Sequence, residues 1–574
     1  MVDVLWIKTM RIDMRATHAV LKILFEAYLK HVRQEIDGLI RSAEMKMADM
    51  LSRQTHTFEA AVDAYRSRRN QDPSKGFRQW YDLARNTSTI VIEDMWDPIY
   101  EDLEVYAQAT FPAGRSRASA LRDAADYISV PNICPQVKGF FLRKVKSEFK
   151  DAAMFVDSNC EADNRPCLEV QAMLNRVAQF LPSMSIPVND HASPRVIVPH
   201  GDRSTTAKQQ ERYAEPFYHD ETTFPVLFNR AQLAIDACSP TSPLGNLSLS
   251  SGSHNMFEGS YGAIQPKTPS LVSNGASWRD VCHQPWLLDI HGALIRPNAL
   301  STSQRLLPLF SSAKLSGVEV ALRFPDTIYW SRDPDYNVNA TDVITESFDM
   351  KQQWLKKLPV AYWRGTNTGG GHDRDNWHRF HRHRFVASTN ATWLRTVQSQ
   401  PRKDWTRLSY TVTDRIISLA EEHTDVGFTS IVCRDDGYQS SNKNCSYLGS
   451  HFVEASYMPL SEILSRYRFL YDVDGNSYSG RFYALLSSNS VVLKATVFQE
   501  WHDARLLPWL HFIPISNHFG QDLWDVLEYF LKNEELGAKI AGGARRWADM
   551  VLRPVDLEIY LLRLLLEWAR FIGI

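Results

Sequence analysis

The sequence has no excess of charge of either sign, because 64 Lys and Arg residues face 66 Asp and Glu residues and the formal net charge is −2. A balanced surface does not favour a polyanion, so bulk electrostatic binding of nucleic acid is not expected as the main function. The 574 residues contain no internal repeat and no low-complexity tract. With 44% hydrophobic and 23% charged residues, the composition is that of globular domains and not of a disordered or fibrous chain.

Long apolar runs are also missing. The first 20 residues contain no apolar core of the length that a signal peptide requires. The run at 20–29 is interrupted by Lys22 and Glu26 and is too short to span a bilayer. The C-terminal segment 557–574 is more apolar but carries four charges, which predict a packed amphipathic helix. These charges are Glu558, Arg563, Glu567 and Arg570. We therefore expect neither a signal peptide nor a membrane anchor in this chain.

Cysteine is scarce, with seven residues and no CxxC spacing, so a zinc ribbon is not expected. Cys433 and Cys445 bracket a polar, turn-rich stretch. They either close a short loop as a disulfide or are two unpaired small core residues. The odd number leaves at least one cysteine without a partner in the chain. Sequons for N-glycosylation are compatible with a secretory lumen, and they lie at Asn86, Asn246, Asn339, Asn390 and Asn444.

The pattern of apolar and turn residues changes along the chain. Residues 15–70 predict helix, because apolar positions recur at intervals of three and four and no proline precedes Pro73. Residues 75–150 predict helices with loops. From about residue 166, short apolar runs alternate with turn residues, and 194–199 is a β-branched run between prolines that predicts a strand. The runs 224–236 and 317–324 predict a strand or a short helix.

The strongest α/β pattern comes later in the chain. A strand is predicted at 468–474, a tight turn at 475–480, and a helix from 481 to 486. Two more strands at 490–494 and 509–514 and a helix at 522–530 follow, and this spacing predicts a doubly wound sheet.

Two glycine-containing segments could hold a phosphate. Residues 362–371, YWRGTNTGGG, follow an apolar run and could aim backbone N–H groups at a phosphate beside Arg364. The alternative is a glycine hairpin with a structural arginine, and the segment is neither a P-loop nor GxGxxG. Residues 472–482 place hydroxyls and Arg481 where a strand passes into a helix, which suits a nucleotide diphosphate. An EF-hand is excluded there because the terminal Glu is missing.

Two further clusters carry functional groups. Residues 378–384, HRFHRHR, have the composition of a metal or nucleic-acid patch, but the favoured interpretation is a solvated or interdomain basic face. In the segment 500–509, Glu500 could accept hydrogen bonds from ribose hydroxyls and Trp501 could pack on a base or sugar. A capped helix buried on its tryptophan side is the alternative.

At these four segments the chain resembles glycosyltransferase family 90, in particular its fungal capsule-associated protein group. Animal relatives are protein O-glucosyltransferases and O-xylosyltransferases. The resemblance is carried by 362–371, 381–386, 471–494 and 498–515, and weaker similarity extends upstream to about residue 50.

The resemblance implies an α/β protein with the GT-B fold, which is two Rossmann-like domains facing a cleft. We expect a helical N-terminal extension at 1–130, an acceptor-side domain at 131–345, and a UDP-sugar-binding domain with a C-terminal helix at 346–574. The implied reaction transfers a sugar, xylose or glucose, from a UDP-sugar to a glycan or protein hydroxyl with inversion. The implied compartment is the Golgi or another part of the secretory lumen. Fungal members usually begin with a transmembrane segment, and a start placed too late would explain its absence here.

The resemblance also assigns donor-binding residues. Those expected at the diphosphate are Arg364, Gly365, Thr366, Ser479 and Arg481, and Glu500 is the candidate ribose or donor contact. Two arginines would stabilise the departing UDP without a metal, so no cofactor is expected to be required, and a dependence on a divalent metal is left open. Nucleic acid is not an expected partner.

The expected catalytic base is where the chain departs from the family pattern of Asn, two variable residues, Asp, one residue and Pro. Ala192 stands at the position of the expected aspartate. Asp190 could serve after a small backbone shift, or His191 could serve with a near-neutral pKa. Alternatively, the protein is a weak or inactive relative that binds nucleotide or glycan without turnover.

Overall fold

The computed structural model of the chain describes most of its residues. These are 14–109, 116–130, 137–147, 150–190, 193–201, 226–247, 271–272, 278–296, 303–331, 336, 349–399, 410–432, 446–449 and 451–574.

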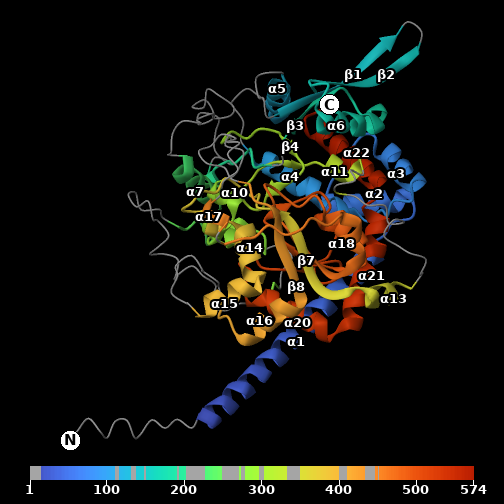
Figure 1. The fold of residues 1–574 in the computed structure, drawn as a ribbon. Helices are drawn as coiled ribbons and strands as arrows, with labels where there is room; N and C mark the ends of the chain where they lie inside the picture. Colours follow the sequence, from blue (N-terminus) through green and yellow to red (C-terminus); the bar gives the residue numbers. More distant parts are fainter. Residues whose placement is uncertain are drawn as a thin grey trace, which may run out of the picture.

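Helices form the N-terminal part of the molecule (Figure 1). They are α1 (Met14–Ser52), α2 (Phe58–Arg69), α3 (Phe77–Asn86), η1 (Glu93–Trp96), α4 (Asp97–Gln108) and α5 (Arg117–Ser129). The prediction of helix over 15–70 missed a break between α1 and α2. The break arises because the Thr57 side chain accepts a hydrogen bond from the Ala60 N–H at 3.2 Å and starts a new helix.

The first sheet is mixed, with the order β2-β1-β3-β4-β6. Its strands are β1 (Val137–Ser147), β2 (Lys150–Ser158), β3 (Met184–Asn189), β4 (Phe310–Ser311) and β6 (Leu322–Arg323). β1 is antiparallel to β2 and β3, whereas β3, β4 and β6 run parallel. The prediction of helices and loops over 75–150 therefore missed β1, in which Phe140 and Leu142 alternate into the core.

The second sheet is parallel throughout, with the order β12-β10-β9-β7-β8. Its strands are β7 (Leu358–Thr366), β8 (Thr424–Ser430), β9 (Tyr467–Val473), β10 (Val491–Ala495) and β12 (Ile513–Pro514). The strands predicted at 468–474 and 490–494 are confirmed. The strand predicted at 509–514 is only two residues long, because Trp509 has a positive φ of 67° that interrupts extended backbone.

A two-stranded antiparallel ribbon joins two parts of the chain, which we call the first half (residues up to 331) and the second half (residues from 349). β5 (Lys314–Leu315) pairs with β11 (Phe498–Gln499), so Lys314 lies opposite Gln499. The ribbon brings the chain that follows β10 against the chain that follows β4.

Shorter helices connect the strands. In the first half they are α6 (Arg165–Val177), η2 (Ala178–Phe180), α7 (Val226–Ala237), η5 (Val281–His283), α9 (Leu287–Ile290), α10 (Gly292–Ile295) and α11 (Thr327–Trp330). In the second half they are α13 (Met350–Lys356), η6 (Trp377–Arg379), α14 (His381–Thr389), α15 (Ala391–Ser399), α16 (Asp414–His423), α17 (Ser446–Gly449), α18 (Leu460–Arg466), α19 (Phe482–Ser487), η7 (Asp503–Arg505), α20 (Gln521–Lys532), α21 (Glu534–Val551) and α22 (Pro554–Phe571). The helices predicted at 481–486 and 522–530 are confirmed as α19 and α20.

The middle of the chain was harder to predict. The predicted strand at 194–199 is wrong, since only Val196 forms a bridge, to Ser303. The predicted segment 224–236 overlaps helix α7, and 317–324 contains the two-residue strand β6.

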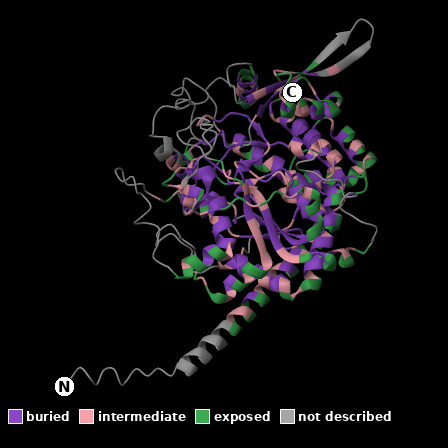
Figure 2. Ribbon diagram, in the orientation of Figure 1, coloured by how far each residue is buried: buried purple, intermediate pink, exposed green. Residues whose placement is uncertain are grey.

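The C-terminal helix α22 returns to the N-terminal helices and completes their core. The Trp80 indole N–H of α3 donates to the carbonyl of Ile559 at 3.1 Å, and Tyr65 of α2 donates to the Glu567 carboxylate at 3.2 Å. One hydrophobic core joins these helices to the first sheet, and a second surrounds β7, β9 and β10. Figure 2 shows the buried residues running through both halves.

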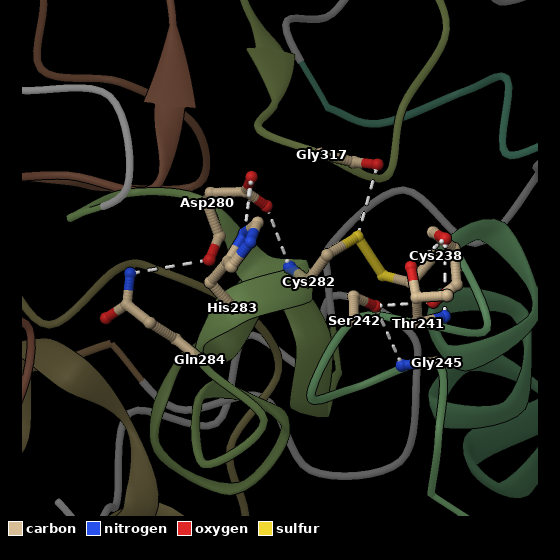
Figure 3. Close-up of a disulfide and its surroundings, with 10 residues drawn as sticks. Cys238, Thr241, Ser242, Gly245, Asp280, Cys282, His283, Gln284 and Gly317 are labelled. Atoms are coloured by element: carbon tan, nitrogen blue, oxygen red, sulfur yellow. Dashed lines mark hydrogen bonds and ion pairs between the residues drawn. A yellow bond between two sulfur atoms is a disulfide. The ribbon is translucent and has the colours of Figure 1, made fainter.

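Two disulfides lie within the first half, Cys160–Cys167 and Cys238–Cys282. The second joins the end of α7 to η5, where the Cys282 N–H donates to Asp280 at 2.9 Å (Figure 3). Neither bridge was predicted from the sequence, and the suggested Cys433–Cys445 bridge lies outside the described residues. Among the described helices, none combines the length and the apolarity that crossing a bilayer requires.

Two sheets and a helical N-terminal part make the protein a mixed α/β structure, as expected. The GT-B arrangement and the domain boundaries at 131 and 346 stay predictions.

Candidate functional site

The predicted site residues of the second half follow the carboxyl ends of neighbouring parallel strands. Residues 367–371 follow β7, 474–481 follow β9, and 496–500 follow β10. Because β10, β9 and β7 are adjacent in the sheet, these three segments meet at one edge, where open α/β folds bind ligands.

Arg481 is a cation at this edge. It precedes helix α19, is partly exposed, and donates from Nη1 to the carbonyl of Arg364 at 2.7 Å. Burial lowers the pKa of its guanidinium, and Asp472 opposes that effect. An arginine remains charged under such conditions. The structure therefore brings Arg481 and the 364–366 segment together, as the sequence analysis expected.

The Arg364 side chain is engaged elsewhere. Its guanidinium pairs with the Asp425 carboxylate of β8, donates to the Asp425 carbonyl at 2.9 Å, and lies 4.7 Å from the centre of the Tyr362 ring. At the predicted site, the backbone carbonyl of Arg364 thus accepts a hydrogen bond from Arg481. The charge of the Arg364 side chain is balanced by the Asp425 carboxylate on the neighbouring strand β8.

Gly365 and Thr366 end strand β7. A Cβ on Gly365 would lie 2.8 Å from the Trp363 ring, so the position has no room for a side chain. The Thr366 hydroxyl donates to the Thr368 hydroxyl at 3.2 Å, and the Thr366 carbonyl accepts from Arg382 at 3.0 Å. Both residues fix the strand end from which the glycine segment departs.

The glycine segment 369–371 directs two of its amides into the protein. The Gly369 N–H donates to the Asn476 side chain at 3.0 Å, and the Gly371 N–H donates to the Arg296 carbonyl at 2.8 Å. Gly369 has a φ of +123°, and a Cβ there would lie 2.4 Å from the His381 ring. These contacts favour the structural interpretation of this segment over a cradle of free N–H groups.

Ser479 and Glu500 are brought together by a residue of the first half. The Tyr329 hydroxyl lies 3.0 Å from Glu500 Oε2 and 3.2 Å from the Ser479 carbonyl. Glu500 is only 2% exposed, and Lys494 Nζ and His502 Nε2 lie 4.0 Å and 3.7 Å from its other oxygen. Burial raises the pKa of the Glu500 carboxyl well above its usual value, and Lys494 opposes that effect.

Lys494 and Asp472 form a buried ion pair beside this group. They lie opposite each other on β10 and β9, and the ammonium donates to the carboxylate at 2.6 Å. The ammonium also lies 3.7 Å from the centre of the Phe482 ring. Asp472 was inside a motif that the sequence analysis singled out, but its partner was not identified.

The basic segment 378–384 is not a solvated face. His381, Arg382 and His383 are buried in α14, and the Arg382 guanidinium donates to the carbonyls of Asp474 and Thr366 at 2.7 Å and 3.0 Å. The His381 ring stacks on His291 of the first half with centroids 4.0 Å apart, and the interdomain interpretation stays a prediction. Burial lowers the pKa of His291 to about 3, so the stacked rings are neutral.

Asp190 lies on the other sheet, directly after β3, and is partly exposed. The neighbouring Asn189 side chain donates to the Ser193 carbonyl at 3.0 Å and to the Ser311 hydroxyl at 3.1 Å. Its carbonyl oxygen accepts from Arg195 at 3.2 Å, and burial lowers the pKa of Arg195 to about 10. His191 and Ala192 lie outside the described residues, so the structure locates only one of the two predicted bases.

Sequence reasoning missed Tyr329 and His291. Tyr329 is 150 residues from Ser479 and 171 from Glu500, and no local motif connects such distant positions. Within the described residues, no group of three or more His, Cys, Asp or Glu side chains is arranged to hold a metal ion.

Comparison with known proteins supports part of the resemblance. Residues 453–574 match the model of glycosyl transferase family 90. This segment contains Ser479, Arg481 and Glu500, whereas Arg364, Gly365 and Thr366 precede it.

Relatives of known activity match over similarly short stretches. O-glucosyltransferase rumi of Drosophila pseudoobscura pseudoobscura is 29% identical over 109 residues, which are 19% of this chain and 27% of that protein. Protein O-glucosyltransferase 3 of Mus musculus is 31% identical over 105 residues, 18% of this chain and 21% of that protein. Protein O-glucosyltransferase 1 of Rattus norvegicus is 28% identical over 111 residues, 19% of this chain and 28% of that protein. The matched stretch thus spans about a quarter of the length of these relatives.

Proposed function

We propose that this protein belongs to glycosyl transferase family 90, is distantly related to protein O-glucosyltransferases, and transfers a sugar from a UDP-sugar to a hydroxyl group of a glycan or protein. Xylose or glucose is the proposed sugar, and the transfer inverts the anomeric carbon. The observation that carries the proposal is Arg481. It lies in the matched segment, at the sheet edge that suits a nucleotide, and donates one described hydrogen bond to the protein, to Arg364.

The proposed architecture is the GT-B fold. In it, the second sheet and its loops bind the donor, and the first sheet, with Asp190 after β3, faces the acceptor. The ribbon of β5 and β11 supports this arrangement, because it ties the segment before Glu500 to the first half of the chain.

The proposed chemistry needs a charge for the leaving group and a base for the acceptor. The Arg481 guanidinium supplies positive charge where the diphosphate departs, so the proposal requires no metal ion. Asp190 or His191 would take the proton from the attacking hydroxyl as the new glycosidic bond forms and the bond to UDP breaks.

A second candidate function is nucleotide or glycan binding without turnover. It is favoured by Ala192, which stands where the family pattern expects the catalytic aspartate. The two functions share the donor site and differ only in turnover.

The proposed compartment is the secretory pathway. Support comes from the disulfides Cys160–Cys167 and Cys238–Cys282, because such bonds form and persist in oxidising compartments.

The first test is UDP binding measured by isothermal titration calorimetry. Arg481→Ala should weaken binding about 10- to 100-fold, because hydrogen bonds to charged groups contribute about 1.5–3 kcal/mol. The matched control is Arg466→Ala, which removes an arginine that is 47% exposed and pairs with Glu462 on helix α18. Equal affinity in the parent and Arg481→Ala would disprove the site assignment.

Turnover is then measured as UDP release from UDP-xylose, UDP-glucose, UDP-galactose and GDP-mannose, with and without manganese. Release from a UDP-sugar supports the transferase. Binding of UDP without release, together with release by Ala192→Asp, supports the inactive relative.

A further inference from the structure

Helix α11 of the first half lies directly on the loop that contains Ser479 and Arg481. The Tyr329 hydroxyl reaches the Ser479 carbonyl at 3.2 Å and Glu500 Oε2 at 3.0 Å. Just before the helix, Asp326 accepts a hydrogen bond from the Tyr478 hydroxyl. A Cβ on Gly480 would lie 2.9 Å from Ile328, so the loop and the helix approach as closely as a glycine allows.

The Tyr329 ring is fixed independently of its hydroxyl. It stacks on Tyr483 of α19 with centroids 3.8 Å apart and an interplanar angle of 8°. The Tyr483 hydroxyl in turn lies 3.1 Å from His502 Nδ1. Removing the Tyr329 hydroxyl alone should therefore leave the ring packed and the fold intact.

Glu500 is buried and not at the surface. With 2% of its surface exposed, its carboxyl is not accessible to a dissolved ligand in this arrangement. Tyr329 itself is also 2% exposed. Through Tyr329, Glu500 is connected to the loop that contains Ser479 and Arg481.

We propose that Tyr329 and Glu500 are positioning residues, which together form an interdomain tether that holds the 479–481 loop so that Arg481 faces the diphosphate. This inference rests on the proposed function, since it concerns the same UDP-sugar site. It assigns part of the donor site to the first half of the chain and gives Glu500 an indirect role.

The test measures UDP affinity by calorimetry in variants of the full chain. Tyr329→Phe removes only the hydroxyl and should weaken UDP binding about tenfold. Glu500→Leu, which removes the acceptor, should have a similar effect, and the double variant should be no weaker than the weaker single variant. Glu500→Gln keeps an acceptor oxygen and should retain affinity within about threefold of the parent.

The matched control is Tyr106→Phe, because the Tyr106 hydroxyl is also buried and donates to the Leu307 carbonyl at 2.9 Å, in contact with none of the site residues. It should leave UDP affinity unchanged. Equal or tighter UDP binding by Tyr329→Phe, or additive losses in the double variant, would overturn the tether.

Amide hydrogen exchange of residues 478–482 in the free protein gives a readout that needs no ligand. Tyr329→Phe should raise exchange there at least tenfold, and Tyr106→Phe should not. If the parent does not bind UDP, the proposed function and the donor role both fail, while exchange still decides whether the tether exists. Unchanged exchange in Tyr329→Phe would refute it.

Discussion

Buried charges are concentrated where distant parts of the chain meet. Arg563 of α22 is 0% exposed and lies 3.1 Å from Glu93 of η1 and 3.2 Å from Glu567 on its own helix. An unpaired charge at such a position would be strongly unfavourable, so each of these residues requires its partners. The charges at 557–574 predicted an amphipathic helix, and the packing of α22 is confirmed. Two of those charges, however, are inside the protein.

The Glu319 carboxyl gives a prediction about pH. It accepts hydrogen bonds from the Arg195 and Leu315 N–H groups at 2.8 Å and 2.9 Å, and burial raises its pKa from 4.5 to about 7. Between these values the unfolded chain releases this proton and the folded chain keeps it. The unfolded state then binds fewer protons, so this group makes stability fall as pH rises from 4.5 to 7.

Glu319→Gln should therefore lose less stability than the parent over this pH range. The difference in unfolding free energy between the two proteins should change by at most about 3 kcal/mol from pH 4.5 to pH 7.5. Urea unfolding at several pH values measures it. Parallel pH profiles for the two proteins would show that the carboxyl ionises as it does in the unfolded chain.

Several site residues were predictable because their motifs are local. Arg481 follows a strand and precedes a helix within one continuous segment, and the structure places it as expected. Tyr329 was not predictable, because what makes it relevant is a contact with residues 150 and 171 positions away. The ion pair of Arg364 with Asp425 could not be predicted either, since it depends on which strand is the neighbour of β7.

Among the elements, α10 approaches the glycine segment 369–371 backbone to backbone. A Cβ on Gly292 would lie 1.5 Å from the Gly369 carbonyl oxygen. The Gly292 N–H also donates to His381 Nδ1 at 3.3 Å. Since backbone meets backbone here, no side-chain rotation can make room for a methyl group.

Gly292→Ala should accordingly destabilise the protein by about 1–3 kcal/mol, the usual cost of overpacking, and weaken contact between the halves. Gly543→Ala is the control, because a Cβ there meets nothing within 4 Å in the middle of α21. It should stabilise the helix by about 0.5–1 kcal/mol. Urea unfolding followed by circular dichroism measures both, and a Gly292→Ala protein as stable as the parent would refute the close approach.

Elements with strong local patterns were predicted well. β9, α19, β10 and α20 follow one another with apolar runs and turn residues between them. The hairpin of β1 and β2 was missed, because its residues alternate with many charges and only pairing with β3 reveals their buried face.

At the scale of the whole molecule, the disulfides constrain loops of different length. Cys238–Cys282 closes a separation of 44 residues, whereas Cys160–Cys167 closes only 7. In the chain-entropy account, the longer loop gives the larger stabilisation, about 4 kcal/mol against about 2.5 kcal/mol.

The double variant Cys238→Ser/Cys282→Ser should therefore lower the unfolding free energy more than Cys160→Ser/Cys167→Ser. Once the disulfides of the parent are reduced, its unfolding free energy should no longer exceed that of either double variant. Chemical unfolding with and without a phosphine reductant measures this. Mass spectrometry that finds all four thiols free in protein from an oxidising compartment would contradict the pairing.

The sequence by itself determined the α/β class, the strand–helix order after residue 467, the family resemblance and the place of Arg481 between a strand and a helix. These depend on periodicity and on short motifs, which are local properties of a chain. Only the tertiary structure decided that His381 and Arg382 are buried, that Arg364 is paired across the sheet, and that Tyr329 joins Glu500 to the Ser479 loop. The physical reason is that burial and pairing depend on which distant segments the fold brings together, and no local pattern records that choice.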